Sequence, residues 1–219
     1  MKYKLLRAIL FACGLSLAVL VNAIAQDSLY QRVIVGNRVK LEVPSHWHIR
    51  DINERKNIAA AAEALRDPGG EKNEGVHVSA LSVVSLPQPV GAIIRVSYLP
   101  TEGLSREEIQ NEIKNNRTQI LQVFAKELQK DNALRRNLEK GGTPMLGKEE
   151  FGTETIGGLI AMTINYRRQS ALGQSAFNVT QYHIHTGEEM VLISLSYRES
   201  DKRLFGPILD RVKRSVTIK

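Results

Sequence analysis

The chain has little cysteine and few aromatic residues, and each shortage excludes a class of function. Cys13 is the only cysteine among 219 residues, and it lies in an apolar run near the start. A chain processed beyond this run has no disulfide and no thiol chemistry. Aromatic residues make up 5% of the sequence, too few for the stacking surfaces that bind unpaired bases. We therefore expect no nucleic-acid partner.

The sequence also lacks a second long apolar run after the one at its start. Three basic residues, Lys2, Lys4 and Arg7, precede an uncharged stretch at 8–21 and the small-residue segment Ala23-Ile24-Ala25. This order is typical of a signal peptide, and the stretch is shorter than the roughly 20 residues of a membrane span. A retained anchor and a lipidated Cys13 are the alternatives. We expect a signal peptide at 1–25, a single domain at 26–219, and a periplasmic or secreted location.

Linear motifs of catalysis are missing as well. The segment 173–177 has Phe177 where the nucleophile elbow of serine hydrolases requires glycine. Gly141-Gly142 and Gly157-Gly158 lack the Lys-Ser or Lys-Thr pair of a phosphate-binding loop. The sequence therefore favours a protein that is not an enzyme and carries no cofactor.

Short stretches rich in Val and Ile, bounded by Gly, Pro and Asn, recur along the chain and predict strands. Gly36-Asn37 suits a tight hairpin turn between the first two of them. The helices fall between groups of strands without regular alternation, which favours an antiparallel sheet covered by helices, an α+β fold. The expected strands are 32–36, 38–43, 77–86, 92–99, 148–154, 159–169, 176–185 and 190–197.

Three helices are expected, each with a recognisable start. Asp51 with Glu54, and Ser105 with Glu108, have the spacing of a capping box. The first helix contains four alanines at 59–62, which suggest close packing, and the second is predicted to run unbroken to Lys140. A third begins at Ser200 or Asp201, with a kink at Pro207. Apolar residues of the second helix share one face, and they are Ile109, Ile113, Ile120, Leu121, Phe124, Leu128, Leu134 and Leu138.

Two stretches at opposite ends of the predicted domain resemble a known superfamily. RVKLEVPSHWHIRD places a strand before Pro44 and Trp47, and MVLISLSYRESDKRLFGPILDRVKRSVTI places a strand, a charged turn and a helix at 190–218. This order resembles the PsbP-like superfamily, which includes DcrB-like bacterial envelope proteins. The resemblance implies an α/β/α sandwich that binds other proteins or assists envelope assemblies, with no shared catalytic residue. The long helix at 105–140 departs from the usual pattern.

Two pairs of histidines have the spacing of metal ligands on a strand. Residues two apart point to one face, so His46 with His48, and His183 with His185, each present two imidazoles. If the pairs met, four ligands would suffice for zinc or copper. The alternative is that all four histidines are solvated and that Trp47 and Ile184 between them belong to the core.

The charge of the chain suits an acidic partner without requiring one. The formal net charge is +7, and basic clusters occur at 135–136, 167–168 and 211–214. The last cluster complements the carbonyls at a helix end; anionic lipid or an acidic protein surface is the alternative reading. We expect a non-enzymatic envelope protein that binds a protein partner, with an anionic membrane surface as a further possible contact. Binding of a small ligand or metal by the histidine pairs is the second hypothesis.

Overall fold

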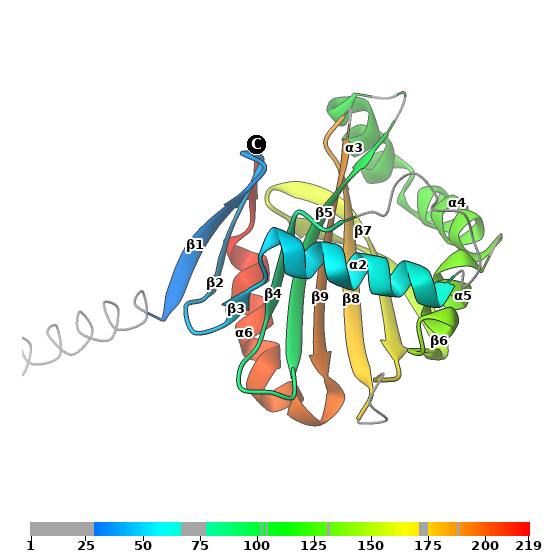
Figure 1. Ribbon diagram of the computed structural model, residues 1–219. Coiled ribbons are helices and arrows are strands. Elements are labelled where there is room, and N and C mark those ends of the chain that lie inside the picture. Colours follow the sequence, from blue (N-terminus) through cyan, green and yellow to red (C-terminus); the bar gives the residue numbers. More distant parts are fainter. Residues whose placement is uncertain are drawn as a thin grey trace, which may run out of the picture.

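A computed structural model describes residues 29–66, 78–101, 103, 105–130, 132–170, 175–187 and 189–219. The predicted signal peptide lies outside these ranges. Within them the chain forms two antiparallel sheets and packing helices (Figure 1). The predicted α+β class is confirmed.

The smaller sheet has the order β1-β2-β10, with bounds Tyr30–Val35, Val39–Pro44 and Thr217–Ile218. Gly36 and Asn37 both have positive φ, 54° and 58°, as the predicted hairpin requires. The last strand pairs with β2 rather than with its neighbour in sequence, so the two ends of the described chain meet in one sheet.

The larger sheet has seven antiparallel strands in the order β3-β4-β5-β9-β8-β7-β6. Most strands pair with a neighbour in sequence, but β5 pairs with β9. The segment between these two strands in sequence forms helices and the antiparallel strands β6, β7 and β8, which extend the sheet beyond β9. The strands are β3 (His48–Ile49), β4 (Leu81–Val84), β5 (Ala92–Pro100), β6 (Met145–Ile156), β7 (Leu159–Arg168), β8 (Phe177–His185) and β9 (Glu189–Arg198).

One face of this sheet, here called the core face, packs against the smaller sheet and α6 (Lys202–Ser215). A short 3-10 helix, η1 (Glu199–Asp201), precedes α6. Trp47 is buried and its ring meets Phe205 of α6 edge-on at 5.8 Å. The predicted core role of Trp47 is thus confirmed. Ile184 is fully buried in the same cluster.

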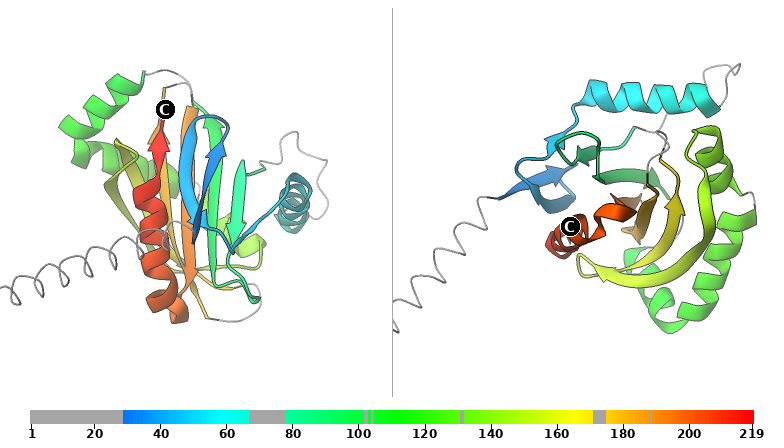
Figure 2. Two further views of the ribbon diagram at one scale, coloured as in Figure 1. Left: turned by 90° about the vertical axis from the view of Figure 1, so that its left-hand side faces the viewer. Right: turned by 90° about the horizontal axis from the view of Figure 1, so that it is seen from below.

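The opposite face, here called the helix-side face, is covered by four helices (Figures 1 and 2). The single helix predicted over 105–140 is wrong: the structure has α3 (Arg106–Asn115), α4 (Arg117–Lys130) and α5 (Ala133–Lys140). The breaks fall at Asn116, which leaves helical geometry, and Asn132, which has φ +47°. Asparagine tolerates such conformations because its side chain bonds locally.

The apolar face predicted for this region is nevertheless correct. Ile113 is buried beneath α3, and Phe124, Leu128, Leu134 and Leu138 pack against a second apolar cluster on β6, β7 and β8. Across the three segments, the apolar side chains predicted for this face are buried or half-buried.

The fourth helix, α2 (Ile52–Arg66), crosses in front of the sheet and reaches α5 (Figure 1). Its capping box forms as predicted, because Asp51 Oδ1 accepts from the Glu54 amide at 2.9 Å and Glu54 Oε2 accepts from the Asp51 amide at 2.8 Å. The close packing predicted for its alanines is wrong. No side chain described at 52–64 is buried, and Ala60 and Ala61 are exposed.

Candidate functional site

The first histidine pair lies at the edge of the larger sheet. His46 and His48 are both exposed, and His48 Nε2 lies 2.9 Å from Oε2 of Glu54 in α2. His48 with Asp51 holds the pKa of Glu54 below its usual range by hydrogen bonding. His48 therefore helps to hold the start of α2 at the sheet edge.

The second pair lies within the sheet, on the helix-side face of β8. His183 is buried, its ring meets Phe124 of α4 edge-on at 5.1 Å, and His185 is half-buried. Among the described residues, His183 Nε2 and His185 Nδ1 are buried nitrogens with no hydrogen-bond partner. Burial lowers the pKa of His183 to about 4, with the neighbouring His185 adding to the shift.

The structure does not bring the two pairs together. Three strands, β4, β5 and β9, lie between β3 and β8, which separates the pairs by roughly 19 Å at about 4.8 Å per strand. In the parts of the chain that the structure describes, no group of three or more histidine, cysteine or carboxylate side chains is arranged to hold a metal. A shared site of four histidines does not form in this arrangement.

A different set of polar residues crosses the middle of the helix-side face. In the strand register, Ser82 of β4 faces Arg95 of β5, Arg95 faces Ser194 of β9, and Ser194 faces Gln181 of β8. Cross-strand partners project to the same side of a sheet. These four residues, here called the polar row, therefore form a continuous polar band over four adjacent strands.

Arg95 is the charged centre of the polar row, and two further arginines approach it. Arg50 lies at the end of β3 and Arg168 at the end of β7, with its guanidinium 4.9 Å from the centre of the Phe177 ring. Desolvation, together with the positive charges of Arg168 and Arg50, lowers the pKa of Arg95 to about 10. Part of the Arg95 side chain is exposed, so water screens part of the repulsion from the two neighbouring arginines. Arg95 therefore remains a cation at neutral pH.

Hydrogen-bond donors surround this charge, and some are uncommitted. Gln181 Nε2 donates to the Tyr166 hydroxyl at 3.1 Å, and burial raises the pKa of Tyr166, so its hydroxyl stays protonated. Ser82 Oγ is buried without a partner in the described part of the chain. The Arg95 guanidinium likewise has no hydrogen bond or ion pair with a described residue. Such a set of groups can bind an anion.

Helix α2 covers this region without filling it. It is tied down by its start, where Arg55 Nη1 donates to the carbonyls of Ser79 and Ala80. Two views at right angles show α2 and α6 on opposite sides of the larger sheet (Figure 2). Since α2 buries no described side chain at 52–64 and Arg95 beneath it is exposed, the centre of the polar row is accessible to a ligand. Ser194 and Gln181 are half-buried, and Ser82 is buried.

The polar row was missed by sequence reasoning, although one signal for it was present. Arg95 interrupts the apolar run Ile93-Ile94-Arg95-Val96, and a charge inside a buried strand is uncommon without a partner. Arg168 belongs to a basic cluster that the sequence did reveal. The meeting of Arg50, Arg95 and Arg168 depends on strand order, which the sequence does not display.

Neither a protein-family model nor a curated protein sequence matches the chain. None of the helices in the described ranges has the length and apolar character of a bilayer span.

Three solved structures that are similar to this chain each have 13% sequence identity to it. The cyanobacterial PsbP of Synechocystis matches with a TM-score of 0.47 over 88% of this chain and 94% of that one. LpqN of Mycobacterium tuberculosis, described as involved in cell envelope biogenesis, gives 0.40 over 89% and 94%. The Ran-binding protein Mog1p of Saccharomyces cerevisiae gives 0.42 over 86% and 95%. A PsbP protein is thus among the solved structures to which this chain is similar.

Proposed function

We propose that this chain is a non-enzymatic exported protein that binds an acidic segment of a partner protein along the polar row. One observation carries the proposal: Arg50, Arg95 and Arg168 converge on the helix-side face, while Arg95 has no anionic partner among the described residues. The signal-peptide pattern at 1–25 supports export.

The energetics of the arginine cluster favour an anionic ligand. Like charges held close together in a partly desolvated place raise the free energy of the unliganded protein. A carboxylate bound there would relieve this repulsion and form charge-assisted hydrogen bonds with the guanidinium of Arg95. The unpartnered Ser82 hydroxyl adds a neutral donor next to that charge.

The shape of the polar row suits an extended segment rather than a single small ion. Four adjacent strands separate its ends by roughly 14 Å at about 4.8 Å per strand. An extended peptide covers this distance with about four residues at 3.3 Å each. Several acidic side chains of one segment can therefore contact the row, with α2 as a movable cover.

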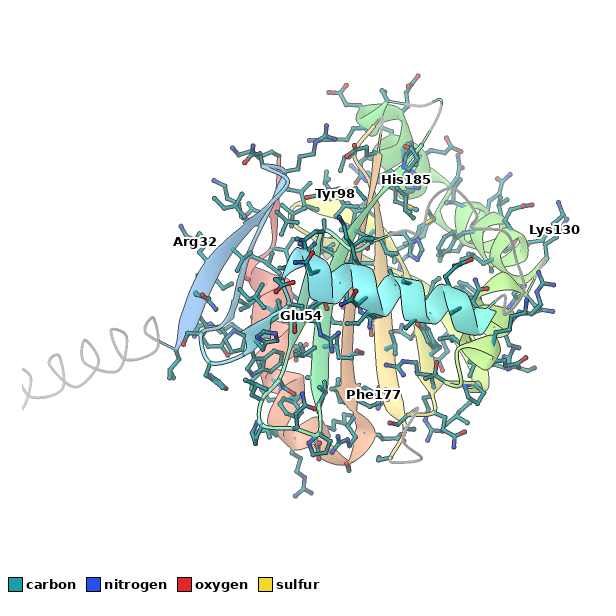
Figure 3. The ribbon with its side chains drawn as sticks, in the orientation of Figure 1. Arg32, Glu54, Tyr98, Lys130, Phe177 and His185 are labelled. Carbon is teal, nitrogen blue, oxygen red and sulfur yellow. The ribbon has the colours of Figure 1, made fainter. Side chains whose placement is uncertain are left out.

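Binding of a fluorescent peptide that alternates Glu and Ser tests the proposal. Arg95→Gln should weaken binding about tenfold or more, because a hydrogen bond to a charged group is worth about 1.5–3 kcal/mol. Arg32→Gln, on exposed β1 far from the sheet face (Figure 3), is the matched control and should bind as the parent chain does. Fluorescence anisotropy at low and physiological salt measures both, with affinity falling as salt rises.

Two results would contradict the proposal. Equal losses in Arg95→Gln and Arg32→Gln would mean that the peptide senses only the net charge of the chain. Binding to vesicles with anionic lipid, unaffected by Arg95→Gln and without peptide binding, would identify the partner as a membrane surface.

A further inference from the structure

An exposed apolar surface lies at one end of the molecule, where the loop between β4 and β5 meets the start of α6. Leu204, in the first turn of α6, is 62% exposed, and Leu86, in the loop, is 43% exposed. The two prolines of the loop are exposed as well. This surface, here called the apolar tip, consists of Leu86, Pro87, Pro89 and Leu204.

Direct contacts hold the loop and the helix next to each other. Arg198, the last residue of β9, donates from Nη2 to the carbonyl of Pro89 at 3.2 Å. The backbone of Gly91, at the end of the loop, lies against the ring of Phe205, the residue after Leu204. Views at right angles place the loop and the start of α6 at the same end of the molecule (Figures 1 and 2). The two parts of the apolar tip therefore form one surface.

The loop uses its own side chains to satisfy backbone groups. Ser85 Oγ accepts from the amides of Gly91 and Ala92, both at 2.9 Å. Gln88 Oε1 accepts from the amide of Val90 at 3.1 Å. The two prolines have no amide hydrogen that needs a partner. Because transfer from water to apolar surroundings is costly for a backbone group without a hydrogen bond, these internal bonds suit the loop to an apolar environment.

Two cations precede Leu204 directly in the sequence. Lys202 and Arg203 are exposed, and no hydrogen bond or ion pair joins either side chain to a described residue. Cations in the first turn of a helix oppose its dipole, so these two do not stabilise α6. Their position beside the apolar tip matches an anionic partner surface.

We infer that the apolar tip docks the chain on the surface of a lipid bilayer that contains anionic lipid. Leu86 and Leu204 enter the boundary between the headgroups and the acyl chains, while Lys202 and Arg203 lie at the level of the lipid phosphates. Binding to such a surface grows with the apolar area that is buried and with the number of nearby cations. The apolar tip shares no residue with the polar row, so the inference is independent of the proposed function.

The small size of the apolar tip favours a bilayer over a protein partner. A stable protein interface buries roughly 800 Å² on each partner, and four partly exposed side chains offer less than this. A bilayer requires no matching shape, and each apolar side chain and each cation adds to the binding. The resulting contact is reversible and weakens as salt rises.

Co-sedimentation with vesicles tests the inference on the chain from Gln26 onward, which lacks the apolar run at 8–21 and contains every described element. The chain should bind vesicles that contain phosphatidylglycerol at least about tenfold more tightly than pure phosphatidylcholine vesicles. Leu86→Ser/Leu204→Ser should weaken this binding about tenfold or more, because less apolar surface leaves water. Ile34→Ser, at a side chain of β1 that is 56% exposed, is the matched control and should bind as the parent chain does.

A second pair of variants tests the cations. Lys202→Gln/Arg203→Gln should weaken binding about tenfold or more, since each basic residue near an anionic surface contributes about fivefold. Lys126→Gln/Lys130→Gln removes the same charge from exposed positions of α4 and should have a smaller effect. Arg95→Gln should leave vesicle binding unchanged, which separates a failure of the apolar tip from a failure of the polar row.

Circular dichroism checks that every variant is folded. If the parent chain does not bind anionic vesicles, the inference is overturned and an apolar protein surface becomes the better candidate for the partner of the tip. Parent-like binding by Leu86→Ser/Leu204→Ser would also overturn it. Equal losses in the two lysine-containing double variants would do the same, because attraction would then depend only on the net charge of the chain.

Discussion

Gly91 lies just before β5, where the chain passes against α6. A Cβ atom built there would be 2.3 Å from Cε2 of Phe205 and 3.2 Å from Oδ2 of Asp201. Phe205 is buried against Trp47, so its ring has little room to retreat. Only a residue without a side chain therefore fits at position 91 while Phe205 keeps its buried position.

We predict that Gly91→Ala lowers the free energy of unfolding by about 1–3 kcal/mol, the usual cost of overpacking. Gly206→Ala is the matched control, because a Cβ at Gly206 in α6 meets nothing within 4 Å. There alanine should change the free energy of unfolding by less than about 0.5 kcal/mol, because its better helix propensity is opposed by the contact of its Cβ with the ring of Pro207, the next residue. Urea unfolding measures both, and a stabilised Gly91→Ala would refute the steric account.

The histidines show how far single residues can be predicted. The spacing of His183 and His185 correctly placed both on one face of a strand, because alternation is a local property of the backbone. Their solvation was predicted wrongly for His183, since α4 covers that part of the face. Which face of β8 a helix covers is decided by residues about sixty positions away, and no local pattern contains it.

Helix starts were predictable from sequence and helix interruptions were not. The capping boxes at Asp51 and Ser105 both form, because they are made by residues three apart. The breaks at Asn116 and Asn132 lie within a continuous apolar period, and asparagine is only mildly unfavourable inside a helix. The positions at which α3, α4 and α5 separate therefore cannot be read from the local sequence pattern.

Helix α2 is expected to be the least protected helix of the described chain against hydrogen exchange. It buries no described side chain at 52–64, whereas α6, of similar length, buries Phe205, Leu209 and Val212. Elements with few buried apolar contacts open locally at low cost. Amide protection in α2 should be at least ~100-fold weaker than in α6. Equal protection, measured by mass spectrometry or NMR, would show that α2 closes the polar row permanently.

At the scale of the whole molecule, the larger sheet is shared by two apolar clusters. The main cluster fills the core face together with α6 and the smaller sheet. The second lies on the opposite face, between β6–β8 and the helices α4 and α5. Composition and periodicity predicted the sheet and its helices, but not this division, because it depends on β5 pairing with β9 across the intervening helices and meander.

This arrangement predicts that the described domain unfolds in one transition. Trp47, the only tryptophan, lies in the main cluster and reports it by fluorescence, while far-ultraviolet circular dichroism reports all helices. Strand β8 contributes Tyr182 and Ile184 to the main cluster, and Phe177 and Val179 to the second cluster. Because both clusters share this strand, unfolding of either one exposes a strand on which the other cluster packs. The two urea unfolding curves should therefore coincide, as two-state behaviour requires. Loss of helical signal at lower urea than the change at Trp47 would mean instead that α3–α5 and the second cluster form a separately unfolding unit.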